Sequence, residues 1–432
     1  MDLAGHKIDP DLALSKLGSV WGKYQLVAFN LASFPWLFCS FQMMSMAFVS
    51  KVPDHACVKT EAEELEFLYG NNDKGATTEN PRMPIRNVSS SCYYYDNSTG
   101  MKLKCLENGT FVAFDQSWGT TIATDWLLIC GRRFLTELSS SIFMFGILVG
   151  SLLLPGVADR WGRKRVIVIS AWCMGLFGVL SGLVPTFPAF VAMRFLAGFS
   201  YGGVGVAGWV LSCEVLAPKL RAYATAGMGF YWTLGYCLMA PMAYAMPDWR
   251  VLTIVMSLPV AVTFVYIWLL PESLHWLVAM SKWEEAESWI HRAAKFNKVT
   301  MRMEDCVLIP DNDEHLVTLL HKRKRSIFTL LKSNVLLCHT GIQTYIWLCN
   351  TFVYYGLSLF STSLAGDRYL NFVLSGLAEL PSYFIISPLM NWTKVGRRGS
   401  SSSVSNSSNP LPLPQCVNSY LKWRRGFHCM CT

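Results

Sequence analysis

The chain has 432 residues, of which 52% are hydrophobic and only 15% charged, with a formal net charge of +8. Lys and Arg concentrate at 160–165, 219–221, 322–325 and 394–398, each beside an apolar run. This distribution orients membrane helices and argues against binding to nucleic acid. No Ser/His/Asp constellation or metal-ligand spacing lies at one membrane depth, so we expect no enzyme activity, no cofactor and no metal.

Apolar runs of about 18 to 25 residues, each long enough to cross a bilayer, recur along the chain. Several contain Gly and Pro, which membrane helices tolerate better than soluble ones. The sequence therefore predicts an all-α, polytopic membrane protein with eight helices. The runs lie near 25–48, 138–157, 166–184, 189–212, 223–246, 250–270, 335–360 and 370–390.

The first polar insert, residues 48–137, carries the features of an extracellular loop. The polar residues 1–23 before helix 1 contain no cleavable signal peptide, so helix 1 is expected to remain as a signal-anchor. An oxidising exterior suits glycosylation and disulfides, although four cysteines permit three pairings. An external insert places the amino terminus in the cytoplasm. The glycosylation sequons are at Asn87, Asn97 and Asn108, and the cysteines are Cys57, Cys92, Cys105 and Cys130.

Two basic turns each follow an apolar run. The first is Gly156-Val-Ala-Asp-Arg-Trp-Gly-Arg-Lys-Arg165, and the weaker second is Thr393-Lys-Val-Gly-Arg-Arg398. A Gly-Arg turn repeated once per half suggests two similar helical bundles. These turns resemble the signature of the major facilitator superfamily of secondary transporters. Pro155 and Thr393 depart from that pattern, which usually has glycine and an acid there.

Three further strings lie in a fixed order with helices between them. They are Pro53-Asp-His-Ala-Cys57, Tyr244-Ala-Met-Pro-Asp-Trp-Arg250 and Pro271-Glu-Ser-Leu-His-Trp-Leu277. Together they resemble the organic cation and carnitine transporter family (solute carrier family 22) within that superfamily. The resemblance runs from about residue 20 to Arg398. It implies a major facilitator-type bundle of two six-helix halves.

The resemblance also implies four more helices after Arg398, where a Ser- and Asn-rich stretch follows instead. We therefore expect a truncated form with a complete six-helix amino-terminal half and an incomplete second half. In the connector, Ser281 is expected to cap a helix that continues to Ile290. The expected organisation is a cytoplasmic segment 1–23, helix 1 at 24–47, the extracellular loop 48–137, helices 2–6 within 138–270, a cytoplasmic connector 271–334, helices 7–8 within 335–390, and a loop motif with a disordered tail at 391–432.

Acids and bases at the inner helix ends predict a cytoplasmic gating network that breaks and reforms as the two bundles rock. Glu214 and Arg221 flank the turn between helices 4 and 5, where they can pair with each other or with the basic cluster. In the alternative interpretation, Glu214 is only an interfacial acid neutralised by Arg221. The predicted network is Asp159, Arg160, Gly162, Arg163, Lys164, Glu214, Arg221, Glu272, Gly396, Arg397 and Arg398.

A substrate site is predicted around Glu379, because ionisable groups inside membrane helices are costly and usually functional. The string Leu374-Ser-Gly-Leu-Ala-Glu-Leu-Pro381 resembles the family segment whose glutamate faces the substrate cavity. The resemblance also places Trp347 and Tyr354 in that cavity, and their seven-residue spacing puts both on one helix face. Alternatively, Glu379 pairs with a base or with backbone freed by Pro381, and the aromatics face lipid.

Two residues of helix 4 bear on the same site. Arg194 matches an arginine of related transporters that pairs with an acid or tunes proton coupling, or else it anchors the helix at the outer interface. Gly205 stands where the family has a tryptophan, which leaves substrate choice more open.

The sequence thus predicts a multi-pass plasma-membrane carrier of small organic cations, or of zwitterions such as carnitine, that works by alternating access. An organic-anion carrier is the alternative within transport, and would be expected to have a basic residue near the position of Glu379. Another alternative is a truncated isoform that does not transport, either inactive or modulating a full-length partner with which it associates.

Overall fold

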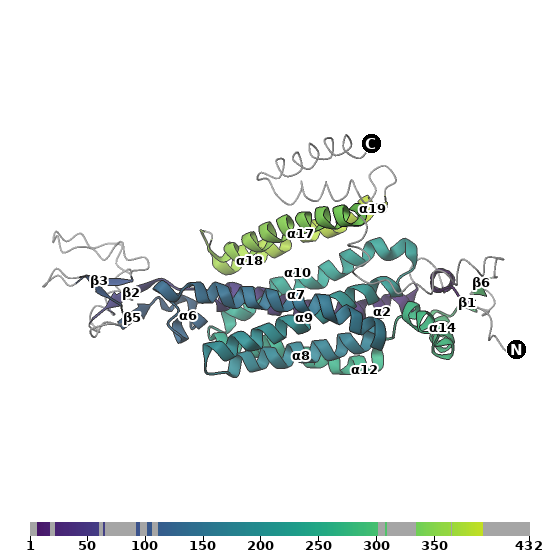
Figure 1. The fold of residues 1–432 in the computed structure, drawn as a ribbon, viewed down its shortest axis with the longest axis horizontal. Helices are drawn as coiled ribbons and strands as arrows, with labels where there is room; N and C mark the ends of the chain where they lie inside the picture. Colours follow the sequence, from purple (N-terminus) through teal and green to yellow (C-terminus); the bar gives the residue numbers. More distant parts are fainter. Residues whose placement is uncertain are drawn as a thin grey trace, which may run out of the picture.

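The computed structural model describes residues 7–17, 22–59, 64, 92–95, 102–105, 111–300, 307–308, 334–363 and 365–391. The predicted sequons and Gly396, Arg397 and Arg398 lie outside these residues. Long helices run along the molecule, with strands β2, β3 and β5 at one end and helices α1 and α14 at the other (Figure 1).

The N-terminal half, here helices α2 to α12, is built from the first six apolar runs. The first run is divided into three consecutive segments. The first break follows Phe34, because Pro35 interrupts the backbone hydrogen bonding there, and the second is at Ser45. The sixth run is also divided, by the 3-10 turn η4. The bounds are α2 Lys23–Ser33, α3 Pro35–Met44, α4 Met46–Val49, α7 Phe134–Trp161, α8 Arg163–Leu183, α9 Phe187–Val215, α10 Arg221–Ala245, α11 Trp249–Ser257, η4 Leu258–Val265 and α12 Tyr266–Leu269.

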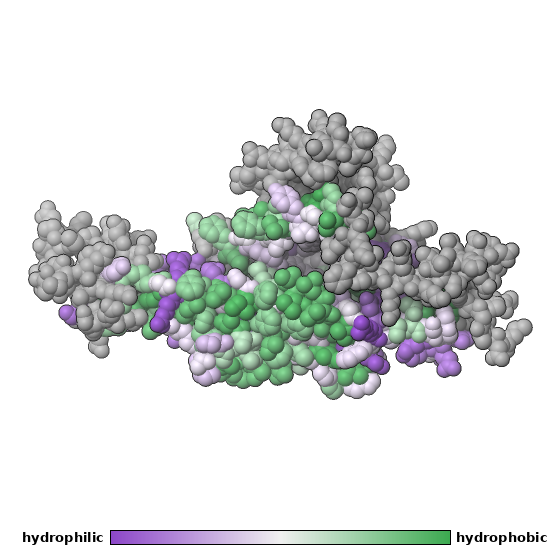
Figure 2. Space-filling view, in the orientation of Figure 1, coloured by the Kyte–Doolittle hydropathy of each residue, from purple (hydrophilic) through white to green (hydrophobic). Residues whose placement is uncertain are grey.

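Five spans within the described residues are long and apolar enough to cross a membrane. They are Lys23–Val49, Cys130–Trp161, Arg163–Leu183, Phe187–Val215 and Trp249–Leu269. Of the other three predicted runs, 223–246 and 335–360 are helical but contain more tyrosine and polar residues, which lowers their hydropathy. The run 370–390 is divided into two helices of 10 and 12 residues, each too short to span. Figure 2 shows the apolar surface gathered over the long helices between two hydrophilic zones, as expected of a polytopic membrane protein.

Helices α7 and α9 approach closely through two facing Gly-x-x-x-Gly pairs. A Cβ atom on Gly146 or Gly150 would meet the carbonyl oxygens of Phe195 or Phe199. The return contact is made by Gly198-Phe-Ser-Tyr-Gly202, whose two glycines face the α7 backbone. Small residues let membrane helices gain van der Waals contact without a side chain between them.

A second core lies at the inner end, where α1 (Pro10–Lys16) packs against α13 (Leu274–Ala279) and α14 (Trp283–Asn297). Leu14 and Trp289 are fully buried there. The prediction that Ser281 caps α14 is wrong. Ser281 has a left-handed backbone conformation (φ 57°). The N-cap residue of α14 is Lys282, and its side chain makes no capping hydrogen bond. Strand β1 (Lys7–Ile8) pairs with β6 (Val307–Leu308) at the same end.

The described part of the loop between helices α4 and α7, here called the ectodomain, contains two antiparallel pairs. Strand β2 (His55–Val58) pairs with β5 (Phe111–Phe114), and β3 (Tyr93–Tyr95) with β4 (Lys102–Lys104). Two disulfides join these parts, Cys57–Cys105 and Cys92–Cys130. The pairing that the sequence left open is therefore 57–105 with 92–130.

The ectodomain is fixed to the N-terminal half at its base. After the 3-10 turn η1 (Gln116–Trp118), Thr120 forms a β-bridge with Asp248, just before α11. Asp125, in helix α6 (Ile122–Asp125), pairs with Arg250 at 3.1 Å. Arg250 also donates to the Gly182 and Val184 carbonyls at the end of α8. One arginine thus ties the ectodomain to two membrane helices.

The second half, here helices α17 (Asn334–Phe360), α18 (Arg368–Leu377) and α19 (Leu380–Asn391), lies on one side of the bundle against α10 (Figure 1). Gly229 of α10 faces the Tyr383 ring, and Gly376 of α18 faces Tyr236. Phe372 of α18 is completely buried in the main core. Helix α10 is therefore the principal described contact between the two halves.

Candidate substrate site and inner charge network

Glu379 lies at a break in the last predicted membrane helix, not within a continuous helix. Helix α18 ends at Leu377 and α19 begins at Leu380, because Pro381 has no N–H to continue the helical ladder. The carboxylate accepts hydrogen bonds from two phenols, Tyr354 at 2.8 Å and Tyr383 at 3.2 Å. These phenols, not a basic side chain, are the partners that the structure records for Glu379.

A hydrogen-bond chain connects this carboxylate to the N-terminal half. The indole Nε1 of Trp232, on α10, donates to the Tyr354 hydroxyl at 2.9 Å, and that hydroxyl donates to Glu379. Trp232 was not among the predicted site residues, because nothing in the sequence distinguishes it from any other tryptophan in an apolar run. The chain joins an acid and two aromatic rings, the groups that bind an organic cation.

Trp347 occupies a different environment on α17. Its side chain is 70% exposed and lines an open groove of about 1150 Å³. The groove lining includes Tyr355 and Met144 but neither Tyr354 nor Glu379. The structure thus brings Tyr354 to the acid, and places Trp347 on a separate surface.

Arg194, on α9, is buried inside the N-terminal half with 2% exposure, so it does not reach the outer interface. It donates to the side-chain and backbone oxygens of Gln42 at 3.3 and 3.1 Å. Its guanidinium lies 4.2 Å from the centroid of the Phe143 ring. Among the described residues, its hydrogen-bond and ring partners are polar or aromatic, not acidic. At Gly205, an added Cβ would meet only the Tyr201 ring, at 3.8 Å.

At the inner end, Arg163 connects two helices through its guanidinium. It pairs with Asp159 of α7 at 3.1 Å and with Glu214 of α9 at 3.2 Å. Glu214 therefore pairs with the basic cluster, and the Glu214–Arg221 pair of the alternative interpretation is not the arrangement found. Arg160 points to the exposed surface. The described members of the predicted network lie together at one end of the bundle.

Glu272 binds the first turn of α8. One carboxylate oxygen accepts from the backbone N–H groups of Arg163 (3.0 Å), Lys164 (3.2 Å) and Ser273 (3.0 Å). Burial raises the pKa of Glu272, although these N–H groups and the charge of Arg163 lower it in part. A carboxylate at a helix amino terminus is favourable because the unpaired N–H groups there carry partial positive charge.

Arg221 belongs to a separate cluster that the sequence did not reveal. Its guanidinium pairs with Asp11 of α1 at 2.5 Å and donates to the Cys213 carbonyl. Nε2 of His275 contacts the same Asp11 oxygen at 3.0 Å. Asp11 thus fastens α1 to the first residue of α10 and to α13.

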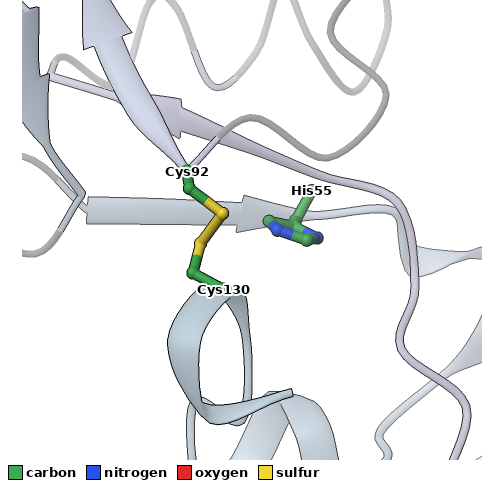
Figure 3. A group of neighbouring side chains, drawn as sticks. All are labelled: His55, Cys92 and Cys130. Atoms are coloured by element: carbon green, nitrogen blue, oxygen red, sulfur yellow. A yellow bond between two sulfur atoms is a disulfide. The ribbon is translucent and has the colours of Figure 1, made fainter. Parts of the chain in front are cut away.

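On the ectodomain, His55, Cys92 and Cys130 come within 4.8 Å of one another (Figure 3). Both sulfurs are joined in the Cys92–Cys130 disulfide, so they do not offer the thiolates that a metal needs. The ring Nδ1 of His55 lies 3.1 Å from the Pro53 carbonyl oxygen. The group is structural in this state.

The fold is that of a solved secondary transporter. The proton:xylose symporter XylE, bound to 6-bromo-6-deoxy-D-glucose, superposes with a TM-score of 0.56 at 16% identity, covering 86% of this chain and 70% of that one. This likeness shows the fold, so the class that the architecture defines is a polytopic membrane protein built as a bundle of long helices.

Sequence comparison narrows this class. The family model described as "Sugar (and other) transporter" matches residues 83–400. An organic cation transporter-like protein of Drosophila melanogaster is 30% identical over 407 residues, covering 90% of this chain and 70% of the relative. Organic anion transporter 3 of Oryctolagus cuniculus is 29% identical over 379 residues, covering 86% and 68%. The chain belongs to the organic cation and carnitine transporter family of the major facilitator superfamily.

Proposed function

We propose that this protein carries small organic cations, or zwitterions such as carnitine, across the plasma membrane by alternating access. The observation that carries the proposal is the series of hydrogen bonds from Trp232 to Tyr354 and from Tyr354 to Glu379. Glu379 is the one carboxylate within the eight apolar runs, and it is bonded to phenols rather than to a base. An uncompensated acid beside aromatic rings suits a positively charged substrate.

The same hydrogen bonds suggest how substrate binding is coupled to the movement of the two halves. Trp232 belongs to the N-terminal half, whereas Tyr354 and Glu379 belong to the second half. A cation held by the carboxylate and flanked by both rings would contact both halves at once. Binding would then favour the state in which the halves approach each other, as alternating access around a midplane site requires.

We also propose that the ectodomain is extracellular and that the amino terminus is cytoplasmic. The two disulfides support an oxidising compartment for 48–137, and the basic turn 160–165 lies at the opposite end of the bundle. A glycosidase should increase the gel mobility of the protein from mammalian cells. Unchanged mobility, together with ectodomain peptides that are protected from protease in intact cells, would place the ectodomain in the cytoplasm and contradict the proposed orientation.

The transport proposal is tested by uptake of radiolabelled tetraethylammonium in cells. Glu379→Gln keeps the shape and one acceptor but removes the charge, so affinity should fall about 10- to 100-fold. Glu284→Gln removes an exposed acid of α14 and should leave uptake unchanged. Surface biotinylation normalises for expression. Unaltered kinetics in Glu379→Gln would reject the site.

The organic-anion alternative is measured in the same cells. Uptake of labelled para-aminohippurate with no uptake of tetraethylammonium would favour it, since relatives of both kinds align with this chain. Association with a full-length family member stays a prediction. Co-purification of a tagged longer member with this chain would support it.

A further inference from the structure

A second cation–aromatic arrangement lies at the outer end, away from Glu379. Arg368 opens α18, and its guanidinium lies 4.0 Å from the centroid of the Trp118 ring, at the end of η1. Arg368 also donates to the Ser117 hydroxyl at 3.2 Å, and that hydroxyl donates to Asp115 at 2.6 Å. A ring face and a hydroxyl thus contact a cation that the protein itself supplies, and the Asp115 carboxylate holds that hydroxyl.

The same indole attracts another cation. The ammonium of Lys51 lies 5.3 Å from the Trp118 centroid. Burial lowers the pKa of Lys51, Arg133 and Arg368 lower it further, and Asp54 and Glu137 act in the opposite direction. The ring therefore faces both a guanidinium and an ammonium, in surroundings that contain acids.

The two sides of this contact belong to different halves. Trp118 precedes the bridge between Thr120 and Asp248, which fixes it to the N-terminal half, whereas Arg368 begins the second half. Below them, Tyr369 of α18 stacks on Phe48 of α4 with ring centroids 5.7 Å apart. Phe372, which is completely buried, packs edge-on against the same Phe48 ring at 5.0 Å. Aromatic rings therefore pack between α4 and α18 at this end of the bundle.

We propose that Trp118, with Ser117 and Asp115, forms an outer binding site for organic cations that Arg368 occupies while the outer side is closed. A quaternary or protonated amine arriving from outside competes with Arg368 for the ring. Because the amine binds only when Arg368 has left, it shifts the population toward separation of α18 from α4. This inference rests on the proposed transport of cations, and it adds a site on which the substrate acts before it reaches Glu379.

Separation of α18 from α4 and α10 can be measured by the chemical modification of a native cysteine. Cys237 of α10 lies in the interface with α18, where its sulfur is 3.8 Å from the Val373 carbonyl oxygen. Cys237 is half-buried with α18 in place, so a membrane-impermeant maleimide, added outside intact cells, should modify it faster when α18 moves away. Mass spectrometry of the peptide that contains Cys237 separates its modification from that of other cysteines.

Tetraethylammonium should raise the rate of Cys237 modification about 2- to 30-fold, the range expected for one cation–aromatic contact. Benzenesulfonate, an organic anion, should not. Arg368→Gln should raise the rate without any ligand. Arg132→Gln removes an exposed arginine from the same ectodomain base and should not.

Replacing the ring tests the site directly. Trp118→Leu should abolish the response to tetraethylammonium, and Trp118→Phe, which keeps a weaker ring and is the gentler change, should reduce it. A full response in both variants would overturn the proposal. Equal basal rates in Arg368→Gln and Arg132→Gln would also overturn it. The modification rates do not depend on uptake. The outer-site proposal can therefore be rejected while Glu379→Gln still loses transport, and transport by the Glu379 site can be rejected while the modification rates support the outer site.

Discussion

Glu272 reaches the first turn of α8 because Gly162 has no side chain. Gly162 has a φ of 103°, which an L side chain rarely adopts, and a Cβ there would collide with the Glu272 carboxylate. The glycine of the basic turn is thus explained by two separate constraints. The positive φ and the contact with Glu272 both apply where α7 ends and α8 begins. Adding one methyl group at residue 162 tests both.

Gly162→Ala should lower thermal stability and surface expression, since it strains the backbone and displaces Glu272 from α8. We expect a loss of about 1 to 3 kcal/mol. Gly156→Ala is the matched control on α7, where an added Cβ would meet no atom within 4 Å. It should be neutral or slightly stabilising, because alanine favours helix. Equal melting temperatures for the two variants, measured in detergent, would contradict this account.

Gly150→Leu should prevent α7 and α9 from packing. The leucine has no space beside the Phe199 backbone, and overpacking commonly costs about 1 to 3 kcal/mol or more. Gly156→Leu places the same side chain on an exposed position of the same helix. Fluorescence-detected size-exclusion chromatography should show aggregation of the first variant only. A monodisperse Gly150→Leu protein would show that this close approach is dispensable.

Tyr354→Phe should weaken tetraethylammonium uptake, because it removes the hydroxyl between Trp232 and Glu379. We expect affinity to fall about 3- to 10-fold, the value of one hydrogen bond. Trp347→Ala should have a smaller effect, since its ring lies in the separate groove. Tyr266→Phe is the control, because this buried hydroxyl has no hydrogen-bond partner among the described residues. A larger loss in Trp347→Ala than in Tyr354→Phe would move the site to the groove.

Asp11→Asn should release α1 from the inner end and speed tryptic cleavage near residues 16–23 several-fold. Asp9→Asn keeps an N-cap of similar strength and should not. Although burial raises the pKa of Asp11, hydrogen bonds from His275 and Arg221 outweigh it and lower the pKa overall. The contact therefore stabilises docking above the ordinary pKa of Asp11 and is lost as the pH falls through the lowered value. Hydrogen exchange of the α1 amides that is equally protected in acid and at neutral pH, after correction for the intrinsic exchange rates, would argue against this role.

The sequence was sufficient for the helical architecture, because long apolar runs carry that information directly. The apolar pattern did not reveal where helices break. Helix 1 bends at Pro35 and the last helix breaks before Pro381, and in both cases the proline was the available signal. The Asp9-Pro10 pair, an N-cap followed by proline, similarly marks the start of α1.

The site was predicted in part. Glu379 and Tyr354, grouped through the family resemblance, are hydrogen-bonded to each other, whereas Trp347, grouped with Tyr354 by the helical period, lies in a separate groove. Substrate binding by these residues stays a prediction. Trp232 and Asp11 could not be identified in the same way, because their partners lie 122 and 210 residues away in the sequence. Which side of an apolar helix faces inward depends on packing that a single sequence does not contain.

The ion pair between Asp125 and Arg250 also sets an order for biosynthesis. The two residues are 125 positions apart, so the ectodomain emerges from the ribosome long before the arginine that secures its base. In the proposed extracellular orientation the disulfides can close in the lumen at once, but Asp125 has its partner only after α8 and the start of α11 have been synthesised. Fixing the ectodomain to the membrane helices through this ion pair therefore cannot precede synthesis of α11, near the end of the N-terminal half.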